Sequence, residues 1–167
     1  METTALLDMI GRVDVTADER LAALAGLKAK IDSGEIETPE RGIFVNNHIH
    51  TSYSFSPYTP TSAVFYAWNA GLRTAGIMDH DSVGGIKEFI KAGEIMEMPI
   101  TCGFECRVNV DGTPLVGKKI NNPDQCSCVY LAMHGIPHQN IDMAEEVLKN
   151  VREKRNIRNR KMRQFFS

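Results

Sequence analysis

The sequence predicts an α/β fold built around a mostly parallel sheet, on three observations. The chain has 167 residues, the size of one ordinary domain. Hydrophobic residues make up 43% and charged residues 24%, near the average for globular domains, which excludes wholesale disorder. From residue 43 onward, short apolar runs alternate with helical stretches, a pattern typical of right-handed βαβ units.

Residues 1–42 are predicted to form a helical extension that carries no obvious chemistry. Apolar side chains recur there at helical spacing, at Leu21, Leu24, Leu27 and Ile31. Thr16 or Asp18 can cap this helix at its start, and Gly34 can end it.

The next part of the chain, residues 43–140, holds the predicted sheet. About four parallel strands are expected, over 43–50, 74–79, 100–108 and 128–133. Helices over 61–70 and 85–98 fill the first two connections, and Gly71 can end the first of them in a left-handed cap. Residues 109–125 contain Asp111-Gly112 and Asn122-Pro123 and predict turns or a small hairpin.

The last part, residues 141–167, is predicted to be a basic helix that Asp142 caps. Its final stretch, residues 149–167, contains one acidic residue, Glu153, and eight basic residues: Lys149, Arg152, Lys154, Arg155, Arg158, Arg160, Lys161 and Arg163. The whole chain has a formal charge of -2, which argues against a nucleic-acid or membrane binder dominated by electrostatics. This charge run is either a solvated helix face or a surface for weak nucleic-acid contact. The helix reaches Phe165-Phe166-Ser167 without a stop signal, so we expect a truncated chain.

No apolar run approaches the roughly 20 residues that cross a bilayer, and the N-terminus lacks the basic region of a signal peptide. We therefore expect a cytoplasmic protein without membrane contact. The four cysteines are spaced CxxxC and CxC, unlike the usual zinc pairs, and are expected to be reduced, buried thiols.

Histidines and one glutamate gather near the predicted strand ends. They are His48 and His50 on the first strand, His80 on the second, Glu105 on the third and His134 after the fourth. Because the carboxyl ends of parallel strands meet at one edge, these side chains can converge, and residues i and i+2 of a strand share a face. Imidazole and carboxylate groups are metal ligands, although hydrogen-bonded strand-end histidines are the ordinary alternative. His138 is expected to be a loop residue.

Several neighbours have open roles. Asp79 can orient a histidine or complete a metal shell, and Asp81 also fits ordinary helix-start chemistry. Gly103 shares a face with Glu105, and its missing side chain is expected to leave room for a ligand. Arg107 or Arg73 can clamp a phosphate oxygen, but their spacing selects neither of them.

Three strings resemble the successive signature motifs of the PHP (polymerase and histidinol phosphatase) family. They are His48-Ile49-His50-Thr51-Ser52-Tyr53-Ser54, Met78-Asp79-His80-Asp81-Ser82 and Gly103-Phe104-Glu105. The resemblance implies a distorted βα barrel with two or three zinc, manganese or iron ions that hydrolyses phosphate esters. It implies metal ligands at His48, His50, His80, Glu105 and, less directly, His134. His80 would bind a third ion or act on the leaving-group oxygen, with Asp79 orienting the shell.

The chain departs from the family pattern at several places. Phe55-Ser56-Pro57 stands where an Asp or His is usual, Met78 stands where Thr is common, and no terminal Asp-x-His follows. The chain thus resembles the N-terminal part of an incomplete barrel. Its open sheet edge is expected to favour self-association.

Three functions compete. The first is a metal-dependent phosphoesterase, or its N-terminal part, that acts on a phosphorylated small molecule or nucleotide through metal-activated water. The second is a catalytically incompetent metal-binding remnant of that fold. The third is a C–N hydrolase of the amidohydrolase type, which the Asp-His-Asp and Gly-x-Glu strings fit poorly.

Overall fold

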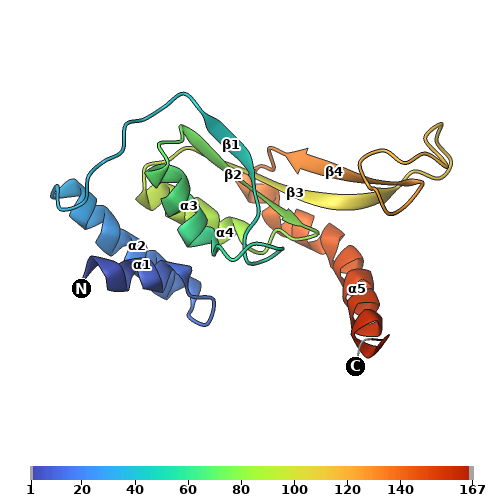
Figure 1. The fold of residues 1–167 in the computed structure, drawn as a ribbon, viewed down its shortest axis with the longest axis horizontal. Coiled ribbons are helices and arrows are strands. Elements are labelled where there is room, and N and C mark those ends of the chain that lie inside the picture. Colours follow the sequence, from blue (N-terminus) through green and yellow to red (C-terminus); the bar gives the residue numbers. More distant parts are fainter. Residues whose placement is uncertain (1, 166–167) are drawn as a thin grey trace.

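The computed structural model describes residues 2–165, except for the side chains of 158, 159 and 161–165, and it confirms the α/β fold (Figure 1). One curled sheet has the strand order β1-β2-β3-β4. The strands are β1 (Val45–Ile49), β2 (Thr74–His80), β3 (Ile100–Asn109) and β4 (Cys128–His134). Each strand lies within two residues of its predicted bounds. The curled four-stranded sheet is consistent with an incomplete barrel.

The fourth strand is not parallel to the others, so this part of the prediction is wrong. β1, β2 and β3 pair in parallel, whereas β4 runs antiparallel to β3. A parallel strand needs a crossover connection, usually a helix, but the chain between β3 and β4 forms turns. The Val110 N–H donates to the Ser127 carbonyl at 3.0 Å and closes this segment at its base as a long hairpin loop.

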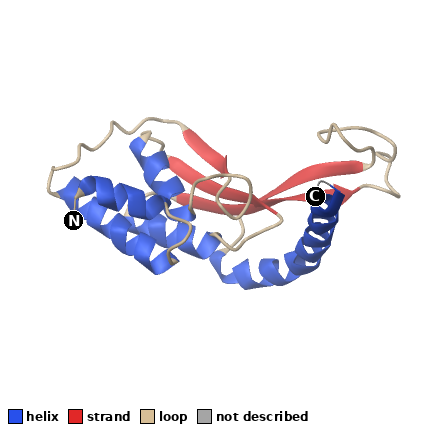
Figure 2. Cartoon of the chain, turned by 60° about the horizontal axis from the view of Figure 1, so that its bottom comes forward, coloured by secondary structure: helices blue, strands red, loops and turns tan. Residues whose placement is uncertain are grey.

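Two helices, α3 (Pro60–Asn69) and α4 (Ile86–Ile95), cover one face of the sheet, and α1 (Thr3–Gly11) and α2 (Ala17–Asp32) pack against them (Figure 2). Thr16 caps α2 as predicted, in a capping box with Glu19. Gly71 ends the α3 region with φ of 71°. The leucine stripe of α2 joins one continuous core with α3, α4 and the sheet.

A buried ion pair ties the N-terminal helices to the sheet-covering helices. Arg20 of α2 donates to both carboxylate oxygens of Glu88 on α4 at 2.8 Å, and the two side chains are 7% and 4% exposed. The Thr61 hydroxyl on α3 donates to the same carboxylate at 2.6 Å. Burial opposes ionisation of Glu88, but the guanidinium and the hydroxyl outweigh it, so the pKa of Glu88 lies below its ordinary value.

The basic C-terminal helix α5 (Ile141–Phe165) follows a 3₁₀ turn, η1 (His138–Asn140). It begins one residue before Asp142, so this residue lies in the first turn instead of the cap, where it pairs with Lys87 at 2.6 Å. Part of the predicted basic run lies outside the described part of the structure, namely the side chains of Arg158, Lys161 and Arg163. So do Phe166 and Ser167, where a truncated chain end is expected.

Two further observations concern membrane-spanning helices and the cysteines. None of the helices in the described ranges combines the length and apolar content needed to span a bilayer. All four cysteines are free, but only Cys102 is buried, which raises the pKa of its thiol to about 11. The prediction of a buried thiol is wrong for Cys126, which is exposed in the β3–β4 connection.

Candidate metal centre

The first histidine pair lies on an irregular strand. The register between β1 and β2 shifts between Asn46 and Ile49, which inserts one extra residue into β1. Gly76 on β2 permits this, because a Cβ at that position would lie 2.7 Å from the Asn47 Cα. His48 lies within this irregular stretch and His50 directly follows it, and both rings face Glu105 of β3.

The predicted ligands converge on one carboxylate. Three imidazole nitrogens surround Oε2 of Glu105: His48 Nε2 at 3.2 Å, His80 Nδ1 at 3.8 Å and His50 Nε2 at 3.9 Å. The rings of His50 and His80 stack with centroids 4.7 Å apart and planes 9° apart. Strand pairing explains this, since His80 and Glu105 are direct partners in the β2–β3 register.

These residues fit a divalent cation. One donor atom from each of His48, His50 and Glu105 lies within 4.8 Å of the others. The two longer contacts to Glu105 exceed hydrogen-bond length, and the buried Nδ1 of His50 has no partner among the described residues. Zinc–nitrogen bonds of about 2.0–2.1 Å require donor atoms a few ångströms apart, so imidazoles facing one carboxylate in this way suit such an ion. The group can therefore hold a metal.

Asp79 and His80 point in different directions. Asp79 is 1% exposed, and its carboxylate accepts the Thr51 N–H and the Thr51 hydroxyl, each at 2.6 Å. Burial raises the pKa of Asp79, and the bonds from Thr51 oppose that rise. Asp79 thus fixes the residue that follows His50. Burial lowers the pKa of His80, against the opposing charge of Glu105, and favours its neutral ring.

His134 reaches the same face by a different route from the predicted one. Because β4 is antiparallel, its carboxyl end returns to the level of Gly103, the direct partner of His134. The His134 ring lies 6.4 Å from the His48 ring, centroid to centroid, and is exposed. It borders the cluster without contacting Glu105. His138 lies outside the cluster, in the 3₁₀ turn η1 that connects β4 to α5, where a loop is expected.

Gly103 does not leave room for a ligand, so that expectation is wrong. A Cβ there would lie 2.3 Å from the Met133 carbonyl oxygen and 2.7 Å from Cε of Met78. Strand β4 and the side chain of Met78 occupy the space. The glycine therefore permits close strand packing beneath the cluster.

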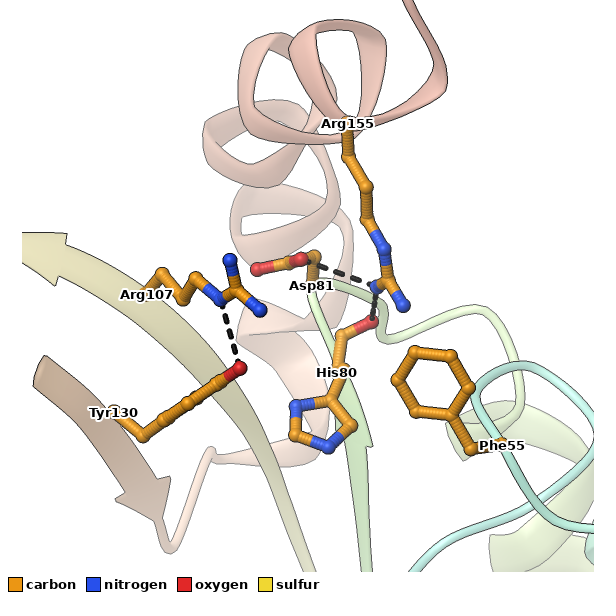
Figure 3. Close-up of a pocket in the computed structure, with 6 residues that line it drawn as sticks. All are labelled: Phe55, His80, Asp81, Arg107, Tyr130 and Arg155. Carbon is orange, nitrogen blue, oxygen red and sulfur yellow. Dashed lines mark hydrogen bonds and ion pairs between the residues drawn. The ribbon is translucent and has the colours of Figure 1, made fainter. Parts of the chain in front are cut away.

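Sequence reasoning missed three side chains around His80, those of Phe55, Tyr130 and Arg155, and left Arg107 as one of two candidate phosphate clamps; Figure 3 shows all four with Asp81. Phe55 and Tyr130 meet the ring of His80 edge-on, at centroid distances of 5.3 and 5.7 Å. Arg155 of α5 donates to the His80 carbonyl at 3.0 Å, and Arg107 donates to the Tyr130 hydroxyl at 2.8 Å. Alternation along β3 places Arg107 on the face of Glu105, but no local signal joins Arg155 to this site.

Comparison with solved structures identifies a similar protein. A solved protein from Bifidobacterium adolescentis ATCC 15703, with a proposed metal-dependent phosphoesterase activity, is similar to this chain with a TM-score of 0.53 and 27% sequence identity. The alignment covers 74% of this chain and 37% of that protein, so this chain spans little more than a third of its length. No protein-family model matches, and a comparison with curated proteins finds no relative.

Proposed function

We propose that this chain forms the metal-binding part of a phosphoesterase that hydrolyses a phosphate monoester or diester. One observation carries the proposal: imidazoles from two strands surround the carboxylate of Glu105 on a third. The similarity to a protein with a proposed metal-dependent phosphoesterase activity supports it. The motifs that resemble the PHP family lie at this cluster.

The proposed ligands divide by position. His48, His50 and Glu105 would hold one ion. Glu105 and His134 would share a second ion. Zinc, manganese or iron would each suit nitrogen and carboxylate donors. A bound divalent cation would neutralise phosphate oxygens and lower the pKa of water from 15.7 toward about 7.

The chain's own residues would prepare this chemistry. His80, whose pKa is lowered by burial, offers a neutral nitrogen that would bind a further ion; to act instead at the leaving-group oxygen, its ring would first have to take up a proton. Asp79 would act through Thr51, whose backbone it holds directly beside His50. Phe55 and Tyr130 wall the ring of His80 and would limit water there.

Metal content and hydrolysis separate the competing functions. We expect purified protein to retain divalent metal and, with added manganese, to hydrolyse p-nitrophenyl phosphate. His50→Ala should lower both metal content and turnover, whereas His138→Ala, outside the cluster, should change neither. Full metal content and activity in His50→Ala would contradict the ligand assignment. Metal binding without turnover would favour the remnant, and hydrolysis of an amide substrate alone would favour the amidohydrolase type.

The substrate is proposed to be a phosphorylated small molecule or nucleotide. Weak nucleic-acid contact through α5 is a second proposal, supported by the exposed Lys149, Lys154 and Arg160. Substituting these three with glutamine should weaken oligonucleotide binding and flatten its salt dependence. Unchanged binding would leave α5 as an ordinary solvated helix.

A further inference from the structure

A basic groove adjoins the candidate metal centre. Its lining is Asp81, Arg107, Val151, Lys154 and Arg155, and its volume is about 240 Å³. A smaller hollow of about 30 Å³ shares Asp81, Arg107 and Arg155 with it and reaches the ring of His80 (Figure 3). The groove therefore adjoins the hollow at His80, beside the site where hydrolysis is proposed.

The groove has the charge and the donors for an anion. Three cationic side chains face one carboxylate, which leaves it a net positive charge. Arg155 is fixed over the Phe55 ring at 4.9 Å and donates to Asp81 at 3.1 Å. Arg107 lies over the Tyr130 ring at 5.1 Å, and its hydrogen bond to Tyr130 uses only Nε. Both Nη groups of Arg107 therefore have no partner among the described residues and can bind a phosphate or carboxylate in a bidentate manner.

The position of Arg107 separates the groove from the metal ligands. Arg107 follows Glu105 by two residues on the same face of β3, about 7 Å farther along the strand. At this separation, one ligand with two anionic groups joined by a short spacer could place one group in the groove and the other at the metal centre.

We propose that the groove binds a second anionic group of the substrate, a phosphate or a carboxylate, carried a few bonds from the ester that is hydrolysed. This inference rests on the proposed function and names its substrate class, a small doubly anionic phosphate ester. It assigns the specificity to Arg107, Arg155 and Lys154.

Binding to the metal-loaded protein tests the proposal, with three probes compared by calorimetry. They are propyl phosphate, propane-1,3-diyl bisphosphate and 4-carboxybutyl phosphate. The bisphosphate or the carboxylate probe should bind at least tenfold more tightly than propyl phosphate, and the tighter of the two identifies the second anion. Arg107→Gln and Arg155→Gln should each reduce this preference about tenfold, because each removes charge-assisted hydrogen bonds. Lys154→Gln, at an exposed position, should reduce it less.

Arg73→Gln is the matched control, since Arg73 is exposed before the first residue of β2, away from the groove. Metal content and thermal unfolding report whether each variant keeps its site and fold. Equal affinity for all three probes, or equal loss of affinity for all three in Arg107→Gln, would overturn the proposal. A preference that depends on Arg107 without any turnover would support the groove and reject the phosphoesterase function. Turnover without such a preference would support the phosphoesterase function and reject the groove as a binding site.

Discussion

His80 and Glu105 are direct partners on neighbouring parallel strands, and Nδ1 of one lies 3.8 Å from Oε2 of the other. The same oxygen faces His48 and His50. Glu105 is thus the centre of the cluster, which leads to the first prediction.

Glu105→Gln should lower the affinity for zinc or manganese by at least tenfold. The amide removes the negative charge on which three imidazoles converge, and even residues that only orient a ligand usually change affinity 10–100-fold. Metal titration followed by elemental analysis measures the effect. Glu94→Gln, on the surface of α4, is the control. Equal metal affinity in the two variants would remove Glu105 from the site.

The strand alternation and the helix signals predicted most of this arrangement. His48 and His50 share a face because strand side chains alternate, and His80 at the end of β2 meets Glu105 because β2 and β3 pair in parallel, although β3 continues to Asn109. Those rules depend only on local geometry, and the structure follows them for β1, β2 and β3.

The remaining features depend on contacts between distant parts of the chain. The direction of β4 depends on how residues 110–127 fold, and turn signals there do not distinguish a crossover from a hairpin. Gly103 was misinterpreted because its neighbours, Met78 and β4, are distant in sequence. Arg155 is separated from His80 by 75 positions in the sequence, and no periodic pattern predicts a contact over that separation.

Thr51→Val should destabilise the fold by about 1–3 kcal/mol, since it leaves the buried Asp79 carboxylate without its hydroxyl partner. It should also weaken metal binding, because Thr51 follows His50 directly. Chemical denaturation and metal titration measure the two effects. Thr38→Val, at an exposed position, is the control. If the two variants had the same stability, the Thr51–Asp79 bond would contribute nothing to the fold.

Gly103→Ala should destabilise the protein by about 1–3 kcal/mol or more, because the new Cβ would meet the carbonyl oxygen of Met133, which belongs to the backbone and cannot rotate away. Gly11→Ala adds the same methyl group where nothing lies within 4 Å, and should not destabilise the fold. Thermal unfolding of both variants gives the comparison. An unaffected Gly103→Ala would mean that β4 does not pack this closely on β3.

Arg20→Met should destabilise the protein by about 3–5 kcal/mol at neutral pH, because it leaves the Glu88 carboxylate buried without its cation. The folded-state pKa of Glu88 lies below its ordinary 4.5, so the ion pair stabilises the fold above that pH. This contribution is lost as the pH falls through the lowered pKa.

Denaturation curves between pH 7 and pH 3 should therefore show the difference between wild type and Arg20→Met shrinking on acidification. In the variant, protonation relieves the unpaired carboxylate, whereas in wild type it breaks the pair. Arg12→Met, which removes an exposed arginine, should have little effect at any pH. A difference that stays constant with pH would show that Glu88 does not carry it.

Strand β1 lies at an edge of the sheet, and we predict that the chain self-associates there. Ile43, Phe44 and Val45 are 81%, 73% and 53% exposed, so the edge presents apolar side chains beside unpaired backbone groups. Sedimentation should show mass rising with protein concentration, and Phe44→Lys should shift that rise to higher concentration. Val13→Lys changes a similarly exposed apolar residue, 68% exposed between α1 and α2, and should leave association unchanged. A monomer at every concentration would contradict this prediction, and equal effects of the two lysines would place the contact elsewhere.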